Sequence, residues 1–166
     1  MLNFKFFKMP VIQLETIIHA PIERCFDLAR SIDFHSYSTA KTKEKAIAGV
    51  TSGLIQRNET VTWEAIHLGV RQRITSKITQ MEFPTYFIDE QVKGAFQSIY
   101  HQHTFEEIEG KVRMVDIFEF KSPLGILGKI ANALFLKKYL TRFLLHRNKM
   151  IKNCAETELW KQFLRH

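Results

Sequence analysis

The chain has 166 residues, of which 45% are hydrophobic and 25% are charged, and its formal net charge is +7. These proportions are typical of a soluble globular protein, and the length predicts a single domain over residues 1–166. No apolar run approaches the length of a bilayer-spanning helix, and the first ten residues lack the apolar segment of a signal peptide, so we expect a cytoplasmic protein. The two cysteines, Cys25 and Cys154, lie far apart and suggest neither a disulfide framework nor a metal site.

The first predicted elements are a strand and two short helices. The strand covers VIQLETIIHA, residues 11–20, because apolar and polar residues alternate there. Pro21 then opens a helix whose apolar residues recur at helical spacing, namely Ile22, Cys25, Phe26 and Ala29. Ser31 can cap a second short helix over residues 31–36.

Six further strands are predicted between the second helix and residue 121. They cover about residues 43–50, 58–68, 70–82, 85–92, 95–108 and 111–121. Short turn signals such as Gly69 and Glu109-Gly110 separate them. Neighbouring strands are therefore expected to pair antiparallel, as a meander.

A long helix is predicted after Ser122-Pro123, from about Leu124 to Cys154. Its apolar stripe changes phase along the way. Leu127, Ile130 and Leu134 define one face, and a second face is defined by Leu136, Tyr139, Leu140, Phe143, Arg147, Met150 and Cys154. We therefore expect a kink or a break near Phe135.

The order of these elements matches the helix-grip architecture, and three motifs strengthen the match. The first is Asp33-Phe34-His35-Ser36, which follows the first helix. The second comprises Asp89, Gln91, Gly94, Phe96, His101, His103 and Phe105, and the third Pro123-Leu124-Gly125 with Leu127-Gly128. On these residues the chain resembles the START-like ligand-binding superfamily, which includes pollen-allergen-type and polyketide cyclase/dehydrase-like proteins. Within it, the chain is similar to a bacterial subfamily sometimes labelled cell-division-related.

The resemblance covers about residues 10–153 and implies an α+β helix-grip fold. In this fold a curved, seven-stranded antiparallel sheet wraps a long C-terminal helix, and two short helices connect the first two strands. A ligand cavity lies between the sheet and the helix. No cofactor is expected, since such cavities are usually free of metal, and no nucleic-acid partner is expected, because the corresponding sequence fingerprints are missing.

A two-residue turn at Glu109-Gly110 fixes the register of the last two strands. It places His103 opposite Asp116 and His101 opposite Phe118. One face then carries eight inward residues, namely Ile99, His101, His103, Phe105, Met114, Asp116, Phe118 and Phe120. We expect Asp116 to pair with His103 inside the protein, because an unpaired buried carboxylate is costly.

The same reasoning gives the candidate cavity wall. Asp89 and Gln91 join it only if a bulge resets the register after Lys93-Gly94. Aromatic and aliphatic residues of neighbouring strands and of the C-terminal helix supply the apolar part. The candidate ligand-binding residues are Trp63, His67, Asp89, Gln91, Ile99, His101, His103, Met114, Asp116, Phe118, Phe120, Tyr139 and Phe143.

Three interpretations of His101, His103 and Asp116 compete. In the first, they are satisfied groups of a cavity that binds or carries an apolar or amphipathic small molecule. In the second, His103 and Asp116, with His101 as a further candidate, act as general acid and base in a cyclase- or hydratase-like enzyme, although no Ser or Cys nucleophile stands beside them. In the third, the three residues form a facial metal triad. We favour the first and expect no metal.

The positive charge is concentrated in the C-terminal helix. Residues 121–152 contain eight Lys and Arg residues and neither Asp nor Glu. One helical face, called the basic face below, carries Lys138, Arg142, Leu145, Lys149 and Lys152. This pattern is usual for a solvated outer face. The alternative is transient contact with an anionic membrane or with an acidic protein.

Overall fold

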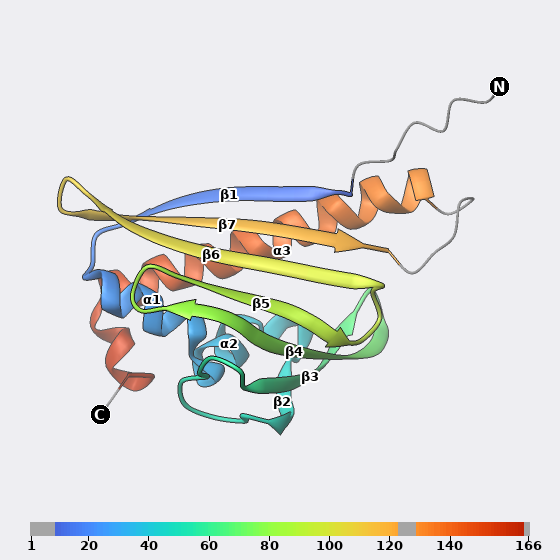
Figure 1. Cartoon of the computed structure of the whole chain (residues 1–166), viewed down its shortest axis with the longest axis horizontal. Helices are drawn as coiled ribbons and strands as arrows, with labels where there is room; N and C mark the ends of the chain where they lie inside the picture. The colour runs from blue at the N-terminus through green and yellow to red at the C-terminus, as the bar shows by residue number, and fades with distance from the viewer. Residues whose placement is uncertain (1–8, 123–128, 165–166) are drawn as a thin grey trace.

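A single curved sheet and a long helix that crosses one of its faces make up most of the molecule (Figure 1). The computed structural model describes residues 9–122 and 129–164. The α+β helix-grip architecture expected from the sequence is confirmed: the sheet has seven strands, two short helices lie between the first two strands, and the long helix is C-terminal.

The seven strands pair antiparallel throughout, in the order β1-β7-β6-β5-β4-β3-β2. The six strands after the helices therefore form the expected meander, and the first strand closes the sheet against the last. The strand bounds are β1 Val11–Ile18, β2 Lys45–Gly49, β3 Thr60–His67, β4 Val70–Glu82, β5 Tyr86–Lys93, β6 Ser98–Ile108 and β7 Lys111–Lys121.

The helices begin largely where the sequence predicts. Helix α1 spans Ile22–Arg30 directly after Pro21, and α2 spans Ile32–Ser38. The Ser31 hydroxyl accepts a hydrogen bond from the Phe34 N–H, so Ser31 is the predicted N-cap. Two short 3₁₀ segments, η1 Ala40–Thr42 and η2 Glu158–Gln162, were not expected.

Helix α3 runs without interruption over Lys129–Glu156, so a break near Phe135 is wrong. The change in the apolar stripe has a different cause. Leu136 and Leu140 pack in one apolar cluster with β6 and β7, whereas Ile151 and Cys154 pack in a second cluster with α1 and α2. A kink within the continuous helix stays a prediction, and residues 124–128 lie outside the described part.

The β6–β7 hairpin has the predicted register. Ile108 pairs with Lys111, His103 with Asp116 and His101 with Phe118. Glu109 and Gly110 have φ values of 50° and 73°, and two successive positive φ values are typical of a tight hairpin turn that matches the twist of the strands. All eight residues predicted to face inward are buried.

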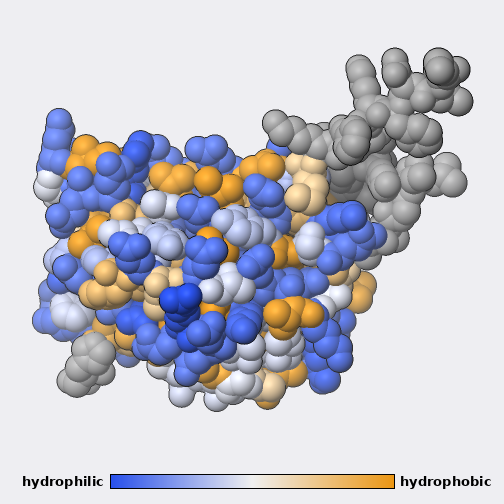
Figure 2. All heavy atoms as spheres, in the orientation of Figure 1, coloured by the Kyte–Doolittle hydropathy of each residue, from blue (hydrophilic) through white to orange (hydrophobic). Residues whose placement is uncertain are grey.

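The surface in Figure 2 is mainly polar, with apolar groups scattered between the charged ones. Within residues 9–122 and 129–164, none of the helices combines the length and the apolar composition needed to cross a membrane.

Candidate functional site: a cavity between the sheet and helix α3

A cavity of about 440 Å³ lies between the concave face of the sheet and α3. The junction of α1 and α2 closes one side of it through Ala29, Ser31 and Ile32. Strands β3 to β7 provide the floor and α3 provides the roof. Most of the wall is apolar, which suits a small molecule that has a hydrophobic body.

Nine of the thirteen candidate ligand-binding residues line this cavity: Trp63, His67, Asp89, Ile99, His101, His103, Phe118, Tyr139 and Phe143. The other four, Gln91, Met114, Asp116 and Phe120, are not among the lining residues. Met114 and Phe120 share the inward face but are fully buried in the apolar core. Facing inward is thus not sufficient to reach the cavity.

Asp116 lies behind the cavity wall and is the centre of a buried polar group, called the Asp116 cluster below (Asp116, His101, His103 and Asn148). His101 Nε2 donates a hydrogen bond of 2.8 Å to Asp116 Oδ1. His103 Nδ1 lies 2.8 Å from the same oxygen, within the expected reach, although its N–H lacks the alignment of a hydrogen bond. Asn148 Nδ2, on α3, donates to Asp116 Oδ2 at 2.6 Å. The carboxylate therefore connects the sheet to the helix.

The cluster also separates the pKa values of its two imidazoles. Burial would raise the pKa of Asp116, but the contacts with His101 and His103 outweigh it and hold that pKa well below its ordinary value. Burial, together with the charge of His103, lowers the pKa of His101. For His103 burial acts in the same direction, but the contact with Asp116 prevails and raises its pKa. The pKa values of the two imidazoles therefore shift in opposite directions although both rings contact the same carboxylate.

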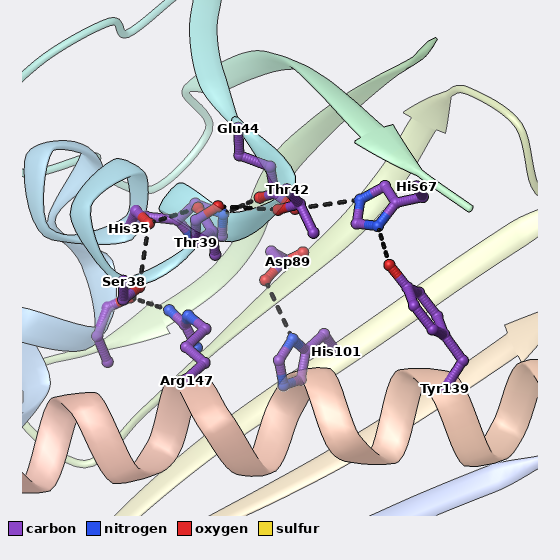
Figure 3. Close-up of polar contacts among 11 residues, drawn as sticks. His35, Ser38, Thr39, Thr42, Glu44, His67, Asp89, His101, Tyr139 and Arg147 are labelled. Carbon is purple, nitrogen blue, oxygen red and sulfur yellow. Dashed lines mark hydrogen bonds and ion pairs between the residues drawn. The ribbon is translucent and has the colours of Figure 1, made fainter. Parts of the chain in front are cut away.

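Asp89 approaches the two imidazoles from the cavity side. Residues 94–97 connect β5 to β6 and set a register in which Asp89 pairs with His101. Its Oδ2 lies 3.8 Å from His101 Nδ1, the contact drawn in Figure 3, and 3.5 Å from His103 Nε2. Gln91 turns away from the cavity, and its amide donates to the Phe96 carbonyl at 2.8 Å.

A second carboxylate also lies between two imidazoles, and sequence reasoning missed it. The Glu44 cluster comprises Glu44, His35, His67 and Tyr139 (Figure 3). Glu44 Oε2 lies 2.6 Å from His35 Nε2, and Oε1 lies 3.1 Å from His67 Nε2. The other nitrogen of His67, Nδ1, lies 2.8 Å from the Tyr139 hydroxyl. Burial would raise the pKa of Glu44, but both histidines outweigh it and lower that pKa to about 2.

Arg147 of α3 is a further polar lining residue that the sequence did not single out as functional. It is 5% exposed, and its guanidinium donates to the Ala29 carbonyl at 2.7 Å. Its Nε has no hydrogen-bond partner among the described residues. The available signal was the position of Arg147 on the apolar stripe of the helix, where a charged side chain is unusual.

Comparisons with known proteins agree with this geometry at the level of the fold. No protein-family model matches the chain, and no curated protein matches it. The Zhui aromatase/cyclase from Streptomyces sp. R1128 is similar in structure, with a TM-score of 0.71 at 10% identity over 90% of this chain and 94% of that chain.

Two further solved structures are similar. A START superfamily protein from Mycobacterium smegmatis gives a TM-score of 0.68 at 11% identity over 88% of this chain and 97% of that chain. Major latex-like protein 151 from Panax ginseng gives 0.66 at 15% identity over 90% of this chain and 99% of that chain. Because identities this low carry information on the fold alone, the conclusion is structural: the protein shares the helix-grip fold of these solved structures.

Proposed function

We propose that the protein binds or carries an apolar or amphipathic small molecule in the cavity under α3. The observation that carries the proposal is the cavity of about 440 Å³, which combines apolar walls with a few convergent polar side chains. Similarity to START and major latex-like proteins supports a ligand-binding role at the level of the fold.

The proposed entrance lies between the β3–β4 turn and the start of the described part of α3. Leu68 and Phe135 both belong to the cavity wall, yet their exposed fractions are 54% and 56%. Large apolar side chains that are half in solvent favour an opening through which an apolar molecule enters. Within the cavity, Arg147 and the two imidazoles of the Asp116 cluster are suited to hold a polar end of the ligand.

A fluorescent apolar probe, anilinonaphthalene sulfonate, tests this proposal by titration. Ser76 lines the cavity from β4, so Ser76→Trp places a large ring in it, and we expect the affinity for the probe to fall at least tenfold. Arg71→Trp is the matched control, because Arg71 lies on the same strand with a side chain that is 70% exposed. Equal probe affinities for the two variants contradict a ligand site in this cavity.

A second candidate function is acid–base catalysis in the same cavity, as in a cyclase- or hydratase-like enzyme. The observation in its favour is that His101 and His103 both line the cavity and both lie 2.8 Å from Asp116 Oδ1. An imidazole held by a carboxylate can move a proton to or from an enolisable substrate.

Deuterium exchange into an enolisable aromatic ketone tests this catalytic function. We expect exchange above the buffer rate, lost in His101→Gln and His103→Gln; exchange at the buffer rate for wild type rejects this candidate.

For the basic face, we propose transient contact with an anionic membrane during ligand loading. Lys138, Arg142 and Lys149 are exposed and have no ion pair among the described residues. Lys152 has a structural role instead, because it pairs with Glu156 at 2.9 Å and donates to the Ile17 carbonyl. Each free basic group near an anionic bilayer contributes on the order of 1 kcal/mol.

Co-sedimentation with phosphatidylserine-containing vesicles tests the membrane contact. We expect binding at low salt that weakens at high salt and is lost in Lys138/Arg142/Lys149→Glu. The variant Lys93/Lys111/Lys121→Glu makes the same charge change at exposed positions of the sheet and should retain binding. If neither wild type nor control binds, or if all three bind equally, the basic face is a solvated outer face.

A further inference from the structure

Three donor atoms converge at the floor of the cavity. His101, His103 and Asp89 each offer one atom that lies within 4.8 Å of the other two. Asp89 Oδ2 is 3.8 Å from His101 Nδ1 and 3.5 Å from His103 Nε2, and both separations are longer than the 2.8 Å contacts that the two rings make with Asp116. Transition-metal bonds of about 2.0–2.2 Å place neighbouring ligand atoms about 3–3.5 Å apart. The separations are thus too long for good hydrogen bonds and close to those found around a shared ion.

Asp116 fixes the orientation of the two imidazoles from the side of the rings opposite Asp89. The nitrogen of each ring that does not face Asp89 lies 2.8 Å from Asp116 Oδ1. Asp116 is itself held by Asn148 at 2.6 Å. A carboxylate behind a histidine fixes its ring and raises its basicity as a ligand, which is the usual second layer of a metal site. Here one carboxylate serves both histidines.

The burial of the three ligand residues and the charge around them also suit a metal ion. His101 and His103 are 6% and 1% exposed, whereas the side chain of Asp89 keeps 24% exposure toward the cavity. Two carboxylates, Asp89 and Asp116, outnumber the one nearby guanidinium, that of Arg147, so with neutral imidazoles the group keeps a net negative charge that favours a bound cation. Two nitrogens and one oxygen are a ligand set that selects first-row transition metals over Mg²⁺ and Ca²⁺.

We propose that Asp89, His101 and His103 bind one divalent first-row transition-metal ion, with Asp116 as the positioning residue for both imidazoles. Three protein ligands leave coordination positions open toward the cavity. The site differs from the triad considered from sequence, because Asp116 lies behind the rings and Asp89 lies in front of them. This inference goes beyond the proposed small-molecule binding and does not depend on it.

The test is a titration of tag-free protein, first treated with chelator and dialysed, with Zn²⁺ by calorimetry and with Co²⁺ by visible absorption. We expect one equivalent of either ion per chain and a Co²⁺ spectrum with nitrogen ligation. Mg²⁺ at the same concentration should give no heat. The absence of stoichiometric Zn²⁺ and Co²⁺ binding overturns the proposal, whatever the protein does with apolar probes.

Substitutions of the proposed ligands and of Asp116 test where the ion binds. His101→Gln and Asp89→Asn should each weaken Zn²⁺ binding at least tenfold. Asp89→Asn keeps the shape of the side chain and an amide oxygen beside the two imidazoles, so we expect this variant to retain the fold. Asp116→Asn should weaken Zn²⁺ by about 10- to 100-fold and alter the Co²⁺ spectrum. His19→Gln removes an exposed histidine outside the cavity and should bind like wild type. Wild-type affinity in folded Asp89→Asn overturns the assignment.

Discussion

The Asp116 cluster and the Glu44 cluster are built from the same parts but differ in what they leave available. In each, one carboxylate lies between two imidazoles at the same cavity. Glu44 uses one oxygen for each histidine, and the remaining nitrogen of His67 faces the Tyr139 hydroxyl at 2.8 Å. Asp116 serves both histidines with one oxygen, so a nitrogen of each ring remains directed toward Asp89 and the cavity.

From this difference we infer a structural role for the Glu44 cluster and keep the Asp116 cluster as the candidate for ligand, proton or ion binding. The Glu44 cluster links three elements that are distant in sequence, since His35 lies in α2, His67 ends β3 and Tyr139 lies in α3. Its polar atoms are mostly used in holding those elements together. The Asp116 cluster is anchored on adjacent strands and on Asn148, which leaves two oriented imidazoles for a ligand, a proton or an ion.

The largest expected effect is the loss of the Asp116 carboxylate. Asp116→Ala leaves two buried imidazoles and the Asn148 amide without their acceptor, so we expect a loss of about 3–5 kcal/mol in the free energy of unfolding. Asp116→Asn should cost less, because its amide oxygen still accepts. Urea denaturation measures both, with Glu107→Ala, an exposed acid on β6, as the control. A wild-type midpoint for Asp116→Ala would mean that the carboxylate is solvated.

The Glu44 cluster should have a smaller and pH-dependent effect. The folded-state pKa of Glu44 is about 2, below its ordinary value of 4.5, so its stabilisation is present above pH 4.5 and is lost as the pH falls toward 2. The shift corresponds to about 3 kcal/mol. Glu44→Gln should therefore be less stable than wild type by about that amount at pH 7, and the gap should narrow between pH 4.5 and 2. A difference in unfolding free energy that stays constant with pH contradicts the pairing of Glu44 with the two histidines. The control is Glu82→Gln, which replaces an exposed acid.

The smallest expected effect concerns the outer contact of the Glu44 cluster. Tyr139→Phe removes the hydroxyl that faces His67 and should cost about 0.5–1.5 kcal/mol. A double-mutant cycle with His67→Gln measures the coupling between the two side chains. We expect the double variant to be less destabilised than the sum of the single variants. Additive losses would show that the two groups do not interact.

The sequence predicted the Asp116 cluster better than the Glu44 cluster because of how each is built. A two-residue turn at Glu109-Gly110 and the period of two along a strand determine which residues face His103, so local rules suffice. The face of the sheet on which Asp89 lies depends on the number of residues in the connection between β5 and β6, and this number is not fixed by the alternation within either strand.

Local sequence rules could not predict the roles of Glu44, Arg147 and Asn148. Glu44 lies between η1 and β2, where no periodicity fixes the direction of a side chain. Arg147 and Asn148 depend on the angle at which α3 crosses the sheet, and this angle is set by packing. The same limit explains the kink or break expected near Phe135, because a change of packing partner along a continuous helix and an interruption of the helix give the same apolar pattern.

Native mass spectrometry of protein purified from its own host tests the central claim, which is that the cavity holds a small molecule. We expect wild-type protein to carry a non-covalent adduct, Arg71→Trp to keep it and Ser76→Trp to lose it. Two results would contradict the claim. In one, wild-type protein carries no adduct and also fails to bind the apolar probe; in the other, Ser76→Trp retains the adduct in full.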